Sequence, residues 1–381
     1  MSLEKGFTNC IIVSVMAFLL ITACISDISP SSDVNNNQSS STETLLSADL
    51  IGLPLSEPGP YSVGIRRNIN FVDTSRNNRE VYLTIWYPAL KSDESASEPI
   101  SDAQADISSA PYPVILSSSK VGFIFAKQLV SYGFVYVGIN GIDTYMHFDQ
   151  KAFDQPLDII FALDQVSVTP PAGLEVMLDT QKAGTLGYSF DGTNSLFLSG
   201  ARVDPEYYLS YCVQASGMEP PLEYSYLNYY CNLSPKWNEL SDYIGMDVTK
   251  SEDGLWQPIT DERIRAVMPM AADGAWFFGE KGLAAANRAV LMIQASKDSQ
   301  YQPAEGAFIF EHLGSKDKTM VSFLGQQHMM IYDQIQIDRM RHFTVAFFSH
   351  QLQGKADMAY YYSQEFIEQF GDLAYGFYPE E

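Results

Sequence analysis

The architecture of this chain follows from Gly184-Thr185-Leu186-Gly187-Tyr188-Ser189-Phe190-Asp191-Gly192, which has the pattern of a buried strand turning sharply into a helix. In a G-x-S-x-G turn, small residues stand two positions before and two after the serine, because the backbone doubles back there. Gly187 fills the first of these positions, whereas Asp191 fills the second. The pattern predicts Ser189 as a nucleophile, and an ordinary strand-to-helix turn is the alternative.

Outside this stretch, strand and helix patterns alternate along the chain. A hairpin is predicted at 61–88, followed by a polar surface loop at 91–112. Such alternation predicts a mainly parallel sheet with helices on both faces, and reactive groups collect at the carboxyl ends of its strands. The further predicted strands are 113–116, 134–139, 264–270, 289–293 and 320–324, and the predicted helices are 123–132, 156–166 with Pro156 at its start, and 340–351.

The N-terminus has the pattern of an export signal. Residues 11–21 are apolar apart from Ser14 and are short for a permanent membrane span. They run into Ile21-Thr22-Ala23-Cys24, which is typical of a bacterial lipobox in which Cys24 is lipidated. Plain signal cleavage and an uncleaved anchor are the alternatives. We therefore expect a signal at 1–24, a disordered Ser/Asn-rich tether at 25–50, and a folded domain at 51–381 that is exported and membrane-anchored.

Between Val203 and about Pro258 the strand–helix alternation is interrupted, which predicts a cap inserted after the helix that follows Ser189. The segment contains Cys212 and Cys231, and in an exported chain this pair predicts a disulfide, with two free buried thiols as the alternative. Its aromatic residues either line a substrate cleft or only pack the cap. Seven of its tyrosines lie between 207 and 230: Tyr207, Tyr208, Tyr211, Tyr224, Tyr226, Tyr229 and Tyr230.

Composition disfavours several classes of function. The chain carries 46 Asp and Glu against 23 Lys and Arg, and so negative a surface repels nucleic-acid phosphates. Neither a His-x-x-x-His motif nor clustered Cys/His spacing appears, so no metal site is predicted. A Gly-rich phosphate loop followed by Lys-Ser/Thr is also missing from the sequence. We expect no metal and no other cofactor.

A serine hydroxyl attacks an ester only with a general base, which a carboxylate must orient. Of the five histidines, His328 follows a predicted strand, 320–324, through a short loop. A loop at a strand end is where an imidazole reaches the serine, so His328 is the predicted base and a surface loop histidine is the alternative. The other histidines precede the serine or lie in predicted helices: His147, His312, His342 and His350.

Two aspartates compete for the role of the orienting acid. Asp298 lies in the loop after the predicted strand 289–293, and Asp273 follows the strand 264–270. Position along the chain favours Asp298 and leaves Asp273 open. The developing oxyanion needs two backbone N–H donors. These are predicted to be Phe190, directly after the serine, and Val121, in the loop 117–122.

These residues carry a resemblance to the bacterial relatives of platelet-activating-factor acetylhydrolase, which are grouped with dienelactone-hydrolase-like lipoproteins. The resemblance implies an α/β-hydrolase fold and a serine hydrolase that cleaves short or oxidised acyl esters, often from lipids, without a metal. In the acetylhydrolase branch the acid follows the earlier strand, as in 272–277. The matching segments span roughly 58 to 362 and are 58–64, 86–88, 155–158, 187–190, the Asp298 loop and His328.

Two sites in the chain differ from the family pattern. Ser119-Lys120 stands where the family has His-Gly in the oxyanion loop, and Asp191 replaces the second glycine of the serine turn. The leading hypothesis is a membrane-tethered serine carboxylesterase that acts on a small-molecule or lipid ester. The alternative, motivated by these two sites, is a catalytically inactive hydrolase fold that serves as a surface binding protein.

Overall fold

The computed structural model describes residues 52–91, 99–140, 151–217 and 230–377. By their contacts the residues form two units, 1–47 and 48–381, and the second unit holds all of the described residues. The predicted signal, its Cys24 and the tether at 25–50 lie outside the described residues. Within the described ranges, none of the helices combines the length and the apolar character needed to cross a membrane.

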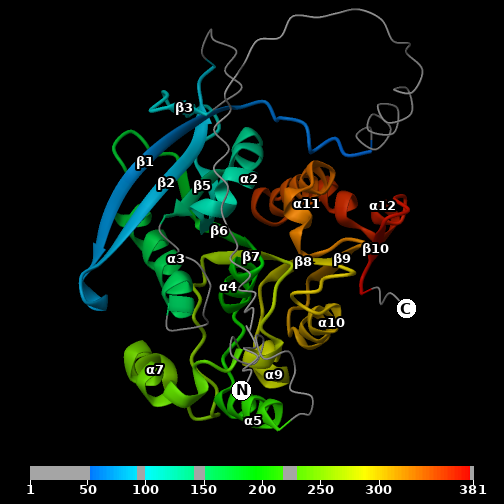
Figure 1. Cartoon of the computed structure of the whole chain (residues 1–381). Coiled ribbons are helices and arrows are strands. Elements are labelled where there is room, and N and C mark those ends of the chain that lie inside the picture. The colour runs from blue at the N-terminus through cyan, green and yellow to red at the C-terminus, as the bar shows by residue number, and fades with distance from the viewer. Residues whose placement is uncertain (1–51, 92–98, 141–150, 218–229, 378–381) are drawn as a thin grey trace, which may run out of the picture. The chain divides into compact units, whose positions relative to one another are not determined.

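A ten-stranded sheet forms the centre of the fold, in the order β10-β9-β8-β7-β6-β4-β5-β2-β1-β3 (Figure 1). Its core, from β5 through β4, β6, β7 and β8 to β9, is parallel. β4 is buried along its whole length, as expected for a central strand covered on both faces. The core strands are β4 (Tyr112–Ser118), β5 (Val135–Ile139), β6 (Leu178–Tyr188), β7 (Ile264–Met270), β8 (Ala289–Ala295) and β9 (Lys318–Phe323).

Antiparallel strands extend both sides of the parallel core. The predicted hairpin is confirmed as β1 (Ser62–Asp73) and β2 (Arg79–Ala89), and β2 pairs antiparallel with β5. A short strand, β3 (Ile100–Ser101), lies inside the predicted surface loop and pairs with β1. At the other edge, β10 (Leu373–Tyr375) pairs antiparallel with β9. The sheet is thus mostly parallel, as predicted, with antiparallel strands at its sides.

Helices cover both faces of the sheet (Figure 1). Buried residues of α2 and α11 belong to one apolar cluster, and those of α3, α4 and α9 belong to a second. Two buried layers around one sheet are the arrangement predicted from the strand–helix alternation. The helices are α2 (Ser119–Ser131), α11 (Gln334–Gln353) and α12 (Gln364–Ile367) on the first face, and α3 (Lys151–Val168), α4 (Phe190–Leu198), α9 (Ala275–Ala284) and α10 (Pro303–His312) on the second.

Helix boundaries differ from the predicted ones where polar side chains have partners elsewhere in the fold. The prediction that Pro156 begins a helix was wrong, because α3 starts at Lys151 and contains the proline. Asp154 and Gln155 precede that proline and are buried, bonded to groups from other elements. α2 begins earlier than predicted because Ser118 caps it, accepting a hydrogen bond from the Val121 N–H.

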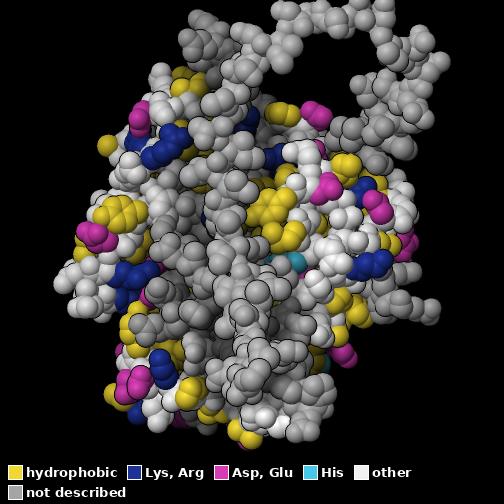
Figure 2. Space-filling view, viewed as in Figure 1, with side chains coloured by type: hydrophobic (Ala, Val, Ile, Leu, Met, Phe, Trp, Pro, Cys, Tyr) yellow, Lys and Arg dark blue, Asp and Glu magenta, His cyan; other side chains and the backbone are white. Residues whose placement is uncertain are grey.

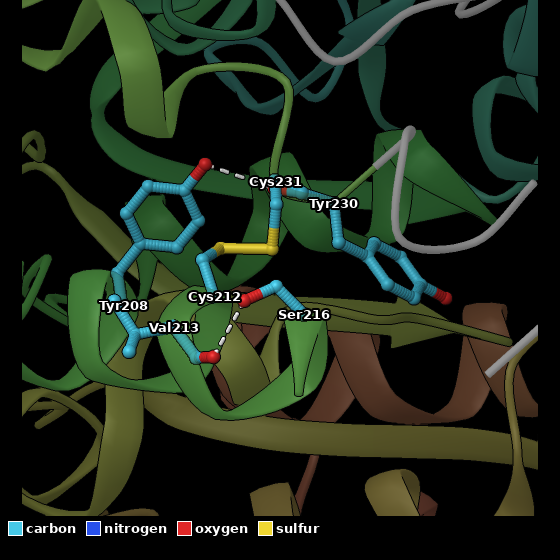
Figure 3. The surroundings of a disulfide bond; sticks show 6 residues. All are labelled: Tyr208, Cys212, Val213, Ser216, Tyr230 and Cys231. Atoms are coloured by element: carbon cyan, nitrogen blue, oxygen red, sulfur yellow. Dashed lines mark hydrogen bonds between the residues drawn. A yellow bond between two sulfur atoms is a disulfide. The ribbon is translucent and has the colours of Figure 1, made fainter. Parts of the chain in front are cut away.

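The described parts of the segment 203–258 contain helices and no strand. The predicted disulfide is confirmed, and it joins Cys212 of α5 to Cys231 across a sequence separation of 19 (Figure 3). By the loop-entropy account this closure stabilises the fold by about 3 kcal/mol. The helices of the segment are α5 (Pro205–Ser216), η2 (Ser234–Lys236), α7 (Trp237–Ile244) and α8 (Met246–Thr249).

Two tyrosines of this segment are core residues. Tyr208 is fully buried, and its hydroxyl donates to the Tyr230 carbonyl at 2.9 Å (Figure 3). Both rings pack against Trp276 of α9, with centroids 5.8 and 4.9 Å away. These two rings therefore pack the segment onto the sheet's second face. Tyr224, Tyr226 and Tyr229 lie outside the described residues, and the placement of a cap over a cleft stays a prediction.

Candidate active site

Ser189 stands at the sharp turn between β6 and α4. Its backbone is in a left-handed region, with φ of 60°, a conformation that costs a non-glycine residue roughly 1–3 kcal/mol. Gly187 allows the turn, because a Cβ there would lie 1.9 Å from the Asp191 carbonyl oxygen. A Cβ on Gly192 would lie 2.9 Å from Ala272, after the neighbouring strand β7. Gly192 is thus the residue of the turn that lies against the end of β7, and residue 191 has room for a side chain.

The three predicted triad residues meet in one hydrogen-bonded chain. His328 Nε2 lies 2.8 Å from Ser189 Oγ, and His328 Nδ1 lies 2.7 Å from Asp298 Oδ2. Ser189 follows β6, Asp298 follows β8, and His328 follows β9 at the start of η3 (His328–Tyr332). Ser189 and Asp298 are 139 and 30 positions from His328 in the sequence. They meet because the carboxyl ends of parallel strands lie at one edge of the sheet.

The surroundings of His328 hold its ring in place. Its side chain is buried, and the ring packs edge-on against Tyr301 with centroids 4.8 Å apart. The Tyr188 hydroxyl donates to the His328 carbonyl. Asp298 Oδ1 accepts backbone hydrogen bonds from Gln300 at 2.9 Å and Tyr301 at 2.8 Å. Because a carboxylate only accepts, Nδ1 carries the ring proton and Nε2 is left to accept from the serine hydroxyl.

Asp273, the rival acid, has other partners. Its Oδ1 accepts from the Gly274 N–H at 2.6 Å, and its carbonyl accepts from the Thr193 hydroxyl at 2.8 Å. Its carboxyl group lies beside Glu305, whose pKa is raised by burial first and then by the charge of Asp273. Glu305 is therefore protonated at neutral pH. Of the two candidates, Asp298 has the described contact with His328, and Asp273 belongs to a buried carboxyl pair.

The two predicted oxyanion donors are placed differently. Phe190 is the first residue of α4 and directly follows Ser189. The Val121 N–H donates to Ser118 Oγ, at 3.3 Å, as part of the cap of α2. In this arrangement the Val121 donor is occupied. The prediction of a loop at 117–122 was wrong from Ser119 onward, because α2 begins there and Val121 lies in its first turn.

A buried polar network links Asp191 to this cap, and the sequence analysis did not identify it. Ser118 Oγ donates to Asp191 Oδ2 at 2.6 Å, and Gln155 Nε2 donates to Asp191 Oδ1 at 2.9 Å. Asn194 donates to the Gln155 side-chain oxygen. The four side chains are buried. The sequence feature that could have indicated this network is Asp191, an aspartate at a position that usually holds glycine.

No protein-family model matches this chain, and a search of curated proteins finds no match. In the described ranges, no group of three or more His, Cys, Asp or Glu side chains is arranged to hold a metal ion.

Proposed function

We propose that this chain is an exported serine carboxylic ester hydrolase with an α/β-hydrolase fold, acting on short-chain or lipid acyl esters. The observation that carries the proposal is the hydrogen-bonded chain from Ser189 through His328 to Asp298. A hydroxyl, an imidazole and a carboxylate in this order form the constellation that activates serine for acyl transfer. The resemblance to platelet-activating-factor acetylhydrolase relatives supports the same reaction class.

In the proposed reaction, His328 Nε2 removes the hydroxyl proton as Ser189 Oγ attacks the acyl carbon. Asp298 keeps the ring oriented and stabilises the imidazolium that forms. The tetrahedral intermediate collapses, and His328 protonates the leaving alcohol. Water then attacks the acyl-enzyme with His328 again acting as base, which releases the acid and restores the serine.

The oxyanion of the tetrahedral intermediate needs backbone donors at the starts of α4 and α2. The Phe190 N–H directly follows the nucleophile and is the first donor. For Val121 to be the second donor, its contact with Ser118 must open as the oxyanion forms. The long 3.3 Å distance of that contact makes such an exchange inexpensive.

Apolar side chains beside the proposed base suit an acyl or lipid substrate. Met329 directly follows His328 and Tyr332 ends the same helix, η3, and the two residues are 43% and 75% exposed. Figure 2 shows hydrophobic side chains gathered beside a histidine near the middle of the face in view. Exposed apolar clusters are typical of surfaces that meet apolar partners. The disulfide fits an oxidising compartment, as does the predicted lipid anchor at Cys24.

The second candidate, an inactive hydrolase fold used for binding, is favoured by one observation: the occupied Val121 donor. Turnover of p-nitrophenyl acetate and butyrate by the purified domain separates the two. The proposal predicts hydrolysis of both esters well above the buffer rate. Hydrolysis at the buffer rate by folded protein would favour the binding role.

A further inference from the structure

Asp191 occupies the position at which the serine turn usually has glycine, and its carboxylate is buried. Taking a charged group out of water is costly unless it is well hydrogen-bonded. Both carboxylate oxygens have such partners, Ser118 Oγ at 2.6 Å and Gln155 Nε2 at 2.9 Å. The side chain also stands in the first turn of α4, where a negative charge is favourable to the helix.

These partners come from other elements of the fold. Ser118 is the last residue of β4 and the cap of α2, and Gln155 belongs to α3. The Gln155 amide is fixed in turn by Asn194 of α4, which donates to its oxygen. One carboxylate thus ties the helix after Ser189 to the start of the helix that carries the second predicted oxyanion donor.

The Ser118 hydroxyl transmits the position of Asp191 to α2. A hydroxyl has one proton to donate, and this proton points to Asp191. Its lone pairs are then directed toward the first turn of α2, where Ser118 accepts the Val121 N–H. The carboxylate therefore sets the side-chain orientation of Ser118, and Ser118 in turn caps the first turn of α2.

We propose that Asp191 is a positioning residue that holds the first turn of α2 in place through Ser118, so that the Val121 N–H needs only to exchange Ser118 Oγ for the oxyanion when the intermediate forms. The inference rests on the proposed ester hydrolysis. Asp191 does not touch the reacting atoms. At the start of α2 this chain has Ser119-Lys120, where the family pattern has His-Gly. The side-chain contact of Asp191 aligns this turn in their place.

The test compares Asp191→Asn, Ser118→Ala and the double variant in p-nitrophenyl butyrate hydrolysis by the otherwise unchanged protein. An asparagine oxygen cannot accept from Ser118 and Gln155 as two carboxylate oxygens do. A fully lost oxyanion donor lowers kcat about 10²- to 10³-fold, so a misaligned one is expected to lower kcat about 10- to 100-fold. KM should change less than about twofold, and the double variant should be no slower than the slower single variant.

Asp73→Asn is the matched control. Asp73 is also a buried carboxylate, but it caps the turn after β1 and accepts from Ser75 and Arg76. Its variant should lose some stability and keep kcat. A wild-type kcat in folded Asp191→Asn would overturn the positioning role. So would a fold-loss of kcat in the double variant equal to the product of the two single losses.

A second readout separates this inference from the proposed function. Amide hydrogen exchange at Val121 should accelerate at least about tenfold in Asp191→Asn, while exchange at Leu129, later in α2, stays unchanged. If the wild-type protein hydrolyses no ester, the proposed function fails, and amide exchange at Val121 still tests whether Asp191 holds the first turn of α2. Unchanged Val121 exchange in Asp191→Asn would overturn that role.

Discussion

His328→Ala is expected to lower kcat for ester hydrolysis by about 10⁶-fold, the loss seen when the base of a serine triad is removed. His328 Nε2 lies 2.8 Å from Ser189 Oγ, so it is the group placed to take the hydroxyl proton. Without it the serine has no base, and any residual rate comes from the oxyanion donors and substrate binding. Steady-state assays with p-nitrophenyl butyrate measure the loss.

The matched control for this variant is His312→Ala. His312 lies in α10 and its Nδ1 contacts the Phe308 carbonyl of the same helix, so its removal should leave kcat within about twofold of wild type. A folded His328→Ala protein that retained more than about one hundredth of the wild-type kcat would contradict the assigned base, because removing the base of a serine triad costs far more than that.

Asp298→Asn is expected to lower kcat by about 10⁴-fold, the effect of the same change in a serine protease triad. An asparagine amide can donate to Nδ1, which moves the ring proton to Nε2. The ring then can no longer accept from Ser189. The geometry stays intact, so KM should change little and the protein should remain folded.

Asp273→Asn tests the rival acid with the same substitution. Asp273 Oδ1 accepts from the Gly274 N–H, whereas the carboxylate in contact with His328 is that of Asp298, so kcat of Asp273→Asn should stay within about tenfold of wild type. Equal losses in both variants, or a larger loss in Asp273→Asn, would show that the triad acid follows β7 and not β8. Circular dichroism and thermal unfolding of both variants exclude misfolding as the cause.

Most of the sheet could be predicted because its strands are short, continuous apolar runs such as 134–139 and 289–293. These patterns do not depend on distant partners. The contacts of Ser189, His328 and Asp298 could be anticipated for a related reason. Each follows a strand of the parallel core, and strand ends converge at one edge. The Cys212–Cys231 pairing followed from there being only two cysteines beyond Cys24.

The remainder depends on tertiary contacts that leave no local pattern. β10 has three residues and exists because it pairs with β9. The start of α3 is held by Asp154, which accepts from the Tyr243 hydroxyl, and by Gln155, which donates to Asp191. The occupied Val121 amide could not be foreseen because it requires Ser118 to be oriented by Asp191, 73 residues away.

Fluorophosphonate labelling of the folded domain, followed by peptide mass spectrometry, tests the central claim most directly. The reagent reacts with serine only where a base and oxyanion donors activate it, so the result reports the assembled site without a choice of ester. We predict a single adduct on Ser189, absent from Ser189→Ala and from heat-unfolded protein. Folded wild-type protein that acquires no adduct, or an adduct that persists in Ser189→Ala, would contradict the account.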